Sequence, residues 1–188
     1  MAPKELTLKK ARSRADYAFH QEYRTRWYLP LPSYTRIYFQ CLYANRYRFD
    51  NDMYAHLNNT VYTMLFDSII NTYLISHCGM DPFTVNKNDS PGPVMKQIAI
   101  IATSYCDYFA SVAFPDVLEL GLRVERLGKS SVTYEVGVFR KGEEDVKVVG
   151  GYTHVFVERE AMRPAAEGME GAVRKGLEGL IKEPKAKL

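Results

Sequence analysis

The most regular apolar pattern in the chain runs through residues 61–77 and predicts one long helix. Polar residues recur on a single stripe, while apolar and aromatic residues cover the rest of the circumference. The stripe consists of Thr60, Thr63, Asp67 and Asn71. A helix with so much apolar surface must be surrounded by other structure. Gly79 can take the left-handed conformation that ends a helix, and Pro82 follows it. We therefore expect a buried central helix.

Four strand-like runs follow this helix, after a polar loop at residues 81–93. They lie at residues 95–108, 117–127, 131–140 and 146–158, and alternation of apolar and polar residues is clearest in the second and third. Short turns between consecutive strands favour an antiparallel meander. One strand is expected before the long helix, and an amphipathic helix at residues 167–181. The pattern predicts an α+β fold, a curved antiparallel sheet around one central helix.

Length and composition narrow the class of protein. The chain has 188 residues, of which 46% are apolar and 25% charged, and these values are typical of one globular domain. Its apolar runs are too short for the ~20 residues of a membrane span, so we expect no membrane insertion. The three cysteines are widely spaced without a C-x-x-C pair, which predicts reduced thiols and no metal site.

Positive charge gathers at the two ends of the chain. The net charge is only +3, and the middle of the sequence is close to balanced. A nucleic-acid-binding protein would carry a basic face on its folded core, so we expect no such partner. The boundaries that we infer are a basic N-terminal segment at residues 1–17, one domain at residues 18–165, and a helix with a tail at residues 166–188.

Chemistry-bearing residues cluster directly before the long helix. Two carboxylates, an imidazole and two amides lie within ten residues, at Asp50, Asp52, His56, Asn58 and Asn59. Unpaired backbone N–H groups at a helix start favour negative charge, so an oxyanion would be stabilised there. The alternative interpretation is structural: an asparagine caps the helix and Asp52 braces the loop. Spacing alone leaves both interpretations open.

This segment resembles the active-site signature of 4-hydroxybenzoyl-CoA thioesterase-like hotdog proteins. The pattern D-x-D-x-x-x-H-x-N-N-x-x-Y is formed by Asp50, Asp52, His56, Asn58, Asn59 and Tyr62. Strand motifs of the same group follow around Cys106, Asp116, Gly128 and His154, so the resemblance covers roughly residues 49–165. It implies a hotdog fold, a homodimer or homotetramer with active sites at the subunit interface, and hydrolysis of an acyl-CoA thioester. Coenzyme A is then part of the substrate, and no cofactor is implied.

The resemblance also implies roles for individual residues. Asp52 occupies the position of the catalytic carboxylate, acting as nucleophile or as general base on water. The backbone N–H of Asn59 occupies the oxyanion-hole position. His56 would orient the loop or polarise the substrate, and Asn58 would hold it in place. A thioester carbonyl needs an attacking group on one side and fixed donors on the other, and this junction supplies both.

Other residues are candidates on weaker grounds. Some relatives place the working carboxylate on the central helix, which makes Asp67 the rival of Asp52; the alternative is a polar contact across a subunit interface. The turn Lys129, Ser130 and Ser131 is suited to a CoA phosphate or pantetheine. Tyr62 could line an acyl pocket, although aromatic residues at helical spacing are more often core. His154 is expected to be a satisfied edge-strand residue.

Two other functions remain compatible with the sequence. A non-catalytic acyl or acyl-CoA binding protein would keep the fold without the chemistry. A hotdog hydratase or dehydratase would need a histidine paired with an acid, and His56 is the candidate for it. The length of the acyl group, and whether it is aromatic or aliphatic, are left open.

One segment interrupts the family spacing. Thr25, Arg26 and Trp27 resemble the strand ending that normally runs straight into the D-x-D pattern, yet Asp50 comes 23 residues after Trp27. Joining Trp27 directly to Phe49 would restore the spacing. Our hypothesis is that residues 28–48 are a lineage-specific insertion or the product of a retained short intron.

The last three residues of the sequence suggest a targeting signal. Ala186, Lys187 and Leu188 resemble the small-basic-Leu signal read by the peroxisomal import receptor. We therefore expect a peroxisomal protein, with the cytoplasm as the alternative. The basic N-terminal segment could suggest a mitochondrial leader, but Glu5 and Asp16 are unusual in such leaders.

Overall fold

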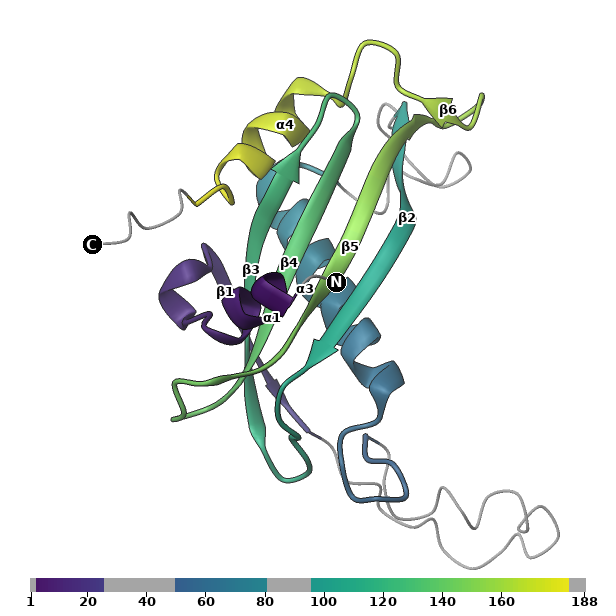
Figure 1. Ribbon diagram of the computed structural model, residues 1–188. Helices are drawn as coiled ribbons and strands as arrows, with labels where there is room; N and C mark the ends of the chain where they lie inside the picture. The colour runs from purple at the N-terminus through teal and green to yellow at the C-terminus, as the bar shows by residue number, and fades with distance from the viewer. Residues whose placement is uncertain (1–2, 26–49, 81–95, 183–188) are drawn as a thin grey trace, which may run out of the picture.

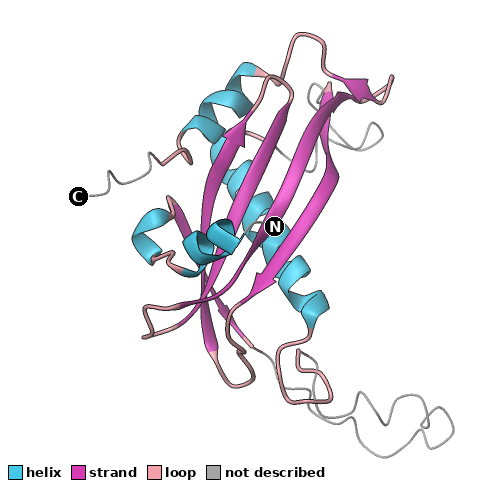
Figure 2. Ribbon diagram, viewed as in Figure 1, coloured by secondary structure: helices cyan, strands magenta, loops and turns pink. Residues whose placement is uncertain are grey.

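A strongly curved antiparallel sheet wraps around one long helix in the computed structural model, which describes residues 3–25, 50–80 and 96–182 (Figures 1 and 2). The helices are α1 (Pro3–Lys10), a short 3-10 helix (Arg14–Asp16), α3 (Asn59–Cys78) and α4 (Gly171–Glu178). The strands are β1 (Phe19–Arg24), β2 (Gln97–Tyr108), β3 (Val117–Leu127), β4 (Ser131–Arg140), β5 (Val146–Glu158) and β6 (Arg163–Pro164). This is the hotdog arrangement expected from the sequence.

The strands pair in the order β1-β3-β4-β5-β2, with the short β6 added to β5. All pairs are antiparallel, and β2 forms a free edge of the sheet within the described part of the chain. A β-bulge lies in β2 between Ile101 and Thr103, opposite Thr153 and His154 of β5. Another bulge lies between Val124 and Arg126 of β3. Bulges bend strands and increase their twist, which helps the sheet to curve around α3.

Helix α3 fills the concave side of the sheet. Its apolar residues are buried against the strands, among them Leu65, Phe66, Ile69 and Ile70. The predicted polar stripe stays outside the core. The helix ends at Gly79, whose φ of 70° is the left-handed cap that the sequence predicts. No described helix is long and apolar enough to cross a membrane.

The N-terminal segment lies on the opposite, convex face of the sheet (Figure 1). The ring of Tyr17 is fully buried over Gly121 and Gly137, where an added methyl group would meet ring carbons at 2.6 and 2.5 Å. Only glycines leave room for this ring. Both faces of the sheet are therefore covered, one by α3 and the other by the start of the chain.

The segment at residues 28–48 lies outside the described residues, but its flanks do not. The Tyr23 hydroxyl donates to Asp50 Oδ2 at 3.0 Å. The Thr25 amide donates to the Asp116 carbonyl at 3.2 Å, and Asn51 Oδ1 accepts from the Phe114 amide at 3.1 Å. The chain therefore leaves β1 and re-enters the fold at the same place. The loop at residues 81–93 and the tripeptide 186–188 also lie outside the described residues.

Candidate active site

The loop before α3 is built around a tight reversal of the backbone. Asn51 and Leu57 form an antiparallel bridge, and the Asp52 amide donates to the His56 carbonyl at 2.7 Å. Ala55 sits at the tip with a φ of 64°, a left-handed conformation that is unusual for a residue with a side chain. Leu57 is buried, and its amide donates to the Val112 carbonyl at 2.7 Å. The loop is thus fixed to the body of the protein at both ends.

The carboxylate of Asp52 is held inside this reversal. Its Oδ1 accepts hydrogen bonds from the backbone amides of Tyr54 and His56, at 2.8 and 3.1 Å. The side chain is half-buried, whereas that of His56 is exposed. The loop-bracing role considered for Asp52 is therefore present. The same two bonds also fix the orientation of the carboxylate, as a catalytic group requires.

The start of α3 divides its two asparagines between different tasks. Asn58 caps the helix: its Oδ1 accepts from the Thr60 amide at 3.0 Å and from the Thr60 hydroxyl at 2.9 Å. Asn59 is the first helical residue, so its own N–H has no intrahelical acceptor. No described residue accepts a hydrogen bond from it either. The Asn59 N–H is therefore available to a ligand at the positive end of the helix.

Asp50, the first carboxylate of the motif, has a structural position. It is fully buried and accepts a hydrogen bond from the Tyr23 hydroxyl. Its backbone carbonyl accepts from the Asn58 amide at 2.7 Å. Asp50 thus ties the end of β1 to the helix start, and the arrangement leaves Asp52 as the carboxylate of this loop that is nearer to solvent.

Aromatic residues lie beside the start of α3. Tyr62 is buried, and its ring meets the ring of Tyr108 at 5.4 Å in an edge-to-face contact. Burial raises the pKa of Tyr62, and the negative charge of Asp52 adds a smaller contribution in the same direction. Tyr108 is 50% exposed. Of the two rings, that of Tyr108 is the accessible one.

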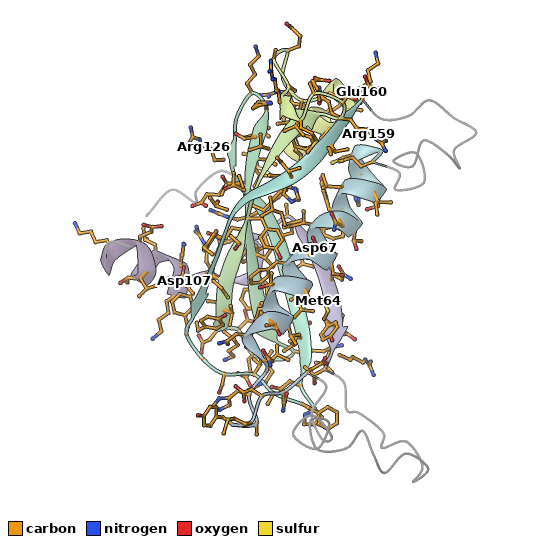
Figure 3. The ribbon with its side chains drawn as sticks, turned by 90° about the vertical axis from the view of Figure 1, so that its right-hand side faces the viewer. Met64, Asp67, Asp107, Arg126, Arg159 and Glu160 are labelled. Carbon is orange, nitrogen blue, oxygen red and sulfur yellow. The ribbon has the colours of Figure 1, made fainter. Side chains whose placement is uncertain are left out.

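The rival carboxylate Asp67 lies elsewhere on α3. It is exposed on the polar stripe one turn after Met64, and Figure 3 shows both residues on the helix beside the sheet. Asp67 follows Asn58 by nine residues, a separation of about 14 Å along the helix axis. A single chain therefore does not bring Asp52 and Asp67 into one site.

Asp67 faces two ionisable groups of β5. Burial raises the pKa of Tyr152 to about 12, with the charge of Asp67 contributing, and the Tyr152 hydroxyl donates to the Thr63 carbonyl. His154 is only 4% exposed, and within the described residues its buried Nδ1 has no hydrogen-bond partner. Burial lowers the pKa of His154, while Asp67 opposes the shift. The expectation of a satisfied edge residue is wrong, because β5 is paired on both sides by β4 and β2.

The proposed CoA turn lies at the far end of the sheet from Asp52. Lys129 is exposed, the Lys129 carbonyl accepts from the Met169 amide, and the Ser130 carbonyl accepts from the Phe156 amide. The Gly128 amide closes the turn on the Ser131 carbonyl at 2.7 Å. Since β3 separates this turn from the Phe114–Asp116 loop by roughly 34 Å, the turn and the Asp52 loop of one chain are far apart.

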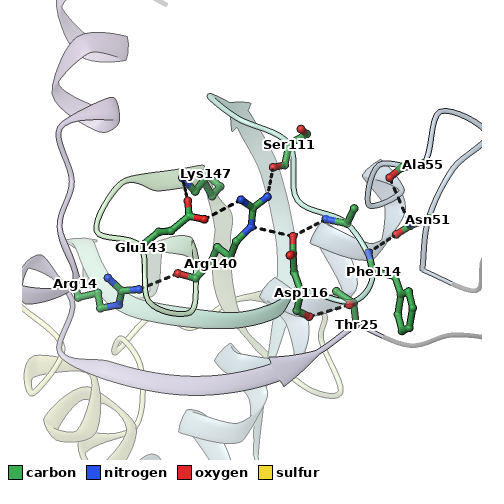
Figure 4. Close-up of polar contacts among 11 residues, drawn as sticks. Arg14, Thr25, Asn51, Ala55, Ser111, Phe114, Asp116, Arg140, Glu143 and Lys147 are labelled. Carbon is green, nitrogen blue, oxygen red and sulfur yellow. Dashed lines mark hydrogen bonds and ion pairs between the residues drawn. The ribbon is translucent and has the colours of Figure 1, made fainter.

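A polar network that the sequence did not single out lies beside Asn51, the residue before Asp52 (Figure 4). Arg140 donates to Asp116 Oδ2 at 3.0 Å, to Glu143 at 2.8 Å and to the Ser111 carbonyl at 3.2 Å. Asp116 Oδ2 also accepts from the Ala113 amide at 2.9 Å. These bonds fix the loop whose Phe114 amide holds Asn51. The pairing of Asp116 with Arg140 has no local sequence signal, because Asp116 lies just before β3 and Arg140 is the last residue of β4.

No described group of three or more histidine, cysteine, aspartate or glutamate side chains has the arrangement of a metal site. A hollow of about 520 Å³ lies on the convex face, among residues such as Arg14, His20 and Lys182. It is on the opposite side of the sheet from α3, and Arg14 is already paired with Glu119. The loop before α3 therefore remains the candidate site.

Comparisons with known proteins identify the family of the chain. Residues 54–147, half of the chain, match the thioesterase superfamily. The crystal structure of the PA5185 protein of Pseudomonas aeruginosa is 37% identical, covers 89% of this chain and 94% of its own, and superposes with a TM-score of 0.68. No curated protein matches the sequence.

More distant structures share the fold. One is a 1,4-dihydroxy-2-naphthoyl-CoA thioesterase from Synechocystis, 11% identical, covering 85% of this chain and 94% of its own with a TM-score of 0.63. Another is a Thermus thermophilus thioesterase complexed with coenzyme A and zinc, 20% identical, covering 90% and 98% with a TM-score of 0.60.

Proposed function

Because the chain belongs to the thioesterase superfamily, we propose that it is an acyl-CoA thioesterase whose catalytic carboxylate is Asp52. One observation carries the assignment. Asp52 is held by two backbone amides in the loop that leads into α3, and the Asn59 N–H at the start of that helix has no acceptor among the described residues. In the proposed arrangement, a thioester carbonyl binds between this carboxylate and this preorganised donor.

The chemistry follows from this pairing. In the nucleophilic route, Asp52 attacks the thioester carbonyl, the CoA thiolate leaves, and water hydrolyses the resulting anhydride. In the general-base route, Asp52 takes a proton from water, which attacks the carbonyl directly. Both routes give the free acid and CoA. The Asn59 N–H stabilises the oxyanion in either case, and the helix dipole adds to it.

We further propose that the active unit is a homodimer joined along β2. This edge strand carries Ile100 and Ile101, of which Ile101 is 51% exposed, and Met64 of α3 is 44% exposed. A long apolar edge strand is a typical association site. Light scattering should therefore give at least twice the mass of the chain.

Such a dimer would also give the Lys129–Ser131 turn a role. A two-fold axis through the β2 edge reverses the direction of the partner strand. One protomer's turn would then lie at the end of the assembly where the other protomer's α3 begins. Lys129 and the two serine hydroxyls would there meet the phosphate or pantetheine part of CoA, as proposed from the sequence.

The decisive test separates catalysis from loop bracing. Asp52→Asn keeps an Oδ1 acceptor for the Tyr54 and His56 amides but removes the charge. We expect the rate of thiol release from acyl-CoA substrates to fall about 10²- to 10⁴-fold, the usual contribution of such a group, with an unchanged thermal midpoint. Asp67→Asn is the matched control, and its rate should stay within about threefold of wild type.

Two results would reassign the site. Full activity of Asp52→Asn would reduce Asp52 to a loop brace, and a large loss in Asp67→Asn alone would move the chemistry to α3. The alternative function, non-catalytic acyl-CoA binding, would appear as ligand binding by wild type without thiol release. The hydratase alternative predicts loss of activity toward an unsaturated acyl-CoA on changing His56.

A further inference from the structure

Three cations of the N-terminal segment hold it on the convex face, and each pairs with an acidic residue on a different strand. Lys9 pairs with Asp107 of β2 at 3.0 Å, Arg12 with Glu135 of β4 at 2.9 Å, and Arg14 with Glu119 of β3 at 2.6 Å. These pairs span 98, 123 and 105 residues of sequence. The segment is therefore an integral part of the sheet's outer layer, and its first anchor is on the free edge strand.

The Lys9 anchor is the most enclosed of the three cations. Lys9 is 5% exposed, and its ammonium lies 4.1 Å from the centre of the Tyr105 ring in addition to the bond to Asp107. A buried ammonium is costly without such partners. The neighbouring Lys10 is exposed. Lys9 alone of these two residues therefore fixes the end of α1 to β2.

The other face of β2, opposite Lys9, carries Tyr108 of the candidate site. Neighbouring residues of a strand point to opposite faces. Tyr105 and Asp107 face Lys9 on the convex side, so Cys106 and Tyr108 face α3. There the Tyr108 ring contacts the Tyr62 ring, with 5.4 Å between the ring centres, close to the start of α3. Figure 3 places Asp107 where α1 joins the sheet, and Met64 on α3 across the sheet from it.

Within one protomer, β2 pairs only with β5 among the described strands, and an edge strand lacks the second row of hydrogen bonds that holds a central strand. The Lys9 contacts are made by side chains on the convex face, so they hold the end of β2 whether or not its free edge pairs with a second protomer. We propose that Lys9 is a positioning residue: by holding Tyr105 and Asp107, it keeps Tyr108 against Tyr62 as the wall that receives the acyl group. The acyl-binding part of this inference rests on the proposed thioesterase function.

The test compares Lys9→Met with Lys10→Met, which removes the same charge from an exposed position. Amide hydrogen exchange across residues 103–108 should be about tenfold faster in Lys9→Met, since a lost charge-assisted bond typically has at least this effect. KM for acyl-CoA should rise about three- to tenfold with kcat within about twofold, the pattern of lost substrate binding. Lys9→Arg keeps the charge and should restore both values, whereas Lys10→Met should match wild type.

Three outcomes would overturn the inference. Exchange at residues 103–108 could be equal in Lys9→Met and Lys10→Met. It could rise evenly across all strands, which would make Lys9 a general stabiliser. KM could stay at the wild-type value while exchange rises, which would separate the anchor from the site. A wild-type protein without thioesterase activity would contradict the proposed function, and the exchange measurement would still decide whether Lys9 holds β2.

Discussion

Asp52 and Asp67 are two carboxylates associated with α3, and the chain holds them in different ways. Asp52 precedes the helix, is half-buried, and takes two hydrogen bonds from amides within four residues of itself. Asp67 is exposed on the helix, and its charge acts on His154 and Tyr152, more than 80 residues later in the chain. The first has a fixed local geometry, while the surroundings of the second depend on how the sheet packs. Preorganisation favours Asp52 as the catalytic group.

Removing the Asn58 cap at the start of α3 should have the largest effect on the region around Asp52. Asn58→Ala loses the bonds to Thr60, and the free energy of unfolding should fall by about 1 kcal/mol. Activity should fall as well, because the Asn59 amide is no longer held in place. Urea denaturation and thiol release measure the two effects.

Two variants sharpen that prediction. Asn58→Asp keeps a good cap but adds a negative charge beside the developing oxyanion, so stability should hold while activity falls. Asn71→Ala changes an asparagine on the exposed stripe and should alter stability by less than about 0.5 kcal/mol. Full activity in Asn58→Asp would argue against an oxyanion site at this helix start.

In the region around Asp67, the stability of the protein should depend on pH through His154. The folded pKa of His154 lies below its ordinary value of 6.5 because the ring is buried. The unfolded chain therefore binds the proton more readily, so stability is complete above pH 6.5 and declines as pH falls toward the folded pKa. His154→Gln should lose less stability than wild type between about pH 7.5 and pH 5.5, as followed by thermal melts.

Asp67 itself should modulate this decline. Its charge favours the protonated imidazole, so Asp67→Asn should make the loss of stability at low pH steeper. His20→Gln, which changes an exposed histidine, serves as the control. Identical pH profiles for wild type and His154→Gln would show that the burial of His154 has no consequence for stability.

The smallest effect is expected from deleting residues 28–48. Joining Trp27 to Phe49 should shift the free energy of unfolding by less than about 1 kcal/mol, because loop-closure cost varies slowly with length. The flanks already meet through Tyr23 and Asp50 at 3.0 Å. Thermal melts and thiol release of the shortened protein measure the effect. Loss of cooperative unfolding would show that the segment is required for folding. A transcript that always contains these codons would exclude the retained-intron version.

Sequence patterns predicted the elements whose signals are local. The apolar period of α3, its end at Gly79 and the alternation in β3 and β4 all belong to short stretches of chain, and the structure confirms them. The loop before α3 was also predictable, because the two amides that donate to Asp52 Oδ1 belong to its own neighbours. The predicted helix at residues 167–181 is realised as the shorter α4.

Features that depend on distant partners were not predictable. Charge sets the basic N-terminal segment apart in the sequence, and nothing local predicts the pairing of Arg12 with Glu135 across 123 residues. The central position of His154 in the sheet was not predictable either. Strand order is set by packing, and a single sequence does not contain that information. The support of the Asp52 loop by Asp116 and Arg140 has the same origin. The roles assigned to Asp52, Asn59 and the Lys129–Ser131 turn remain predictions that the experiments above test.

The packing of the Tyr17 ring on Gly121 and Gly137 makes the start of the chain depend on residues in its central part. Even an alanine at either glycine would collide with the ring, so it would push the opening segment off the sheet together with its ion pairs. Evolutionary change at these three positions should consequently be concerted. A variant in which one glycine alone has acquired a side chain would need a smaller residue in place of the tyrosine.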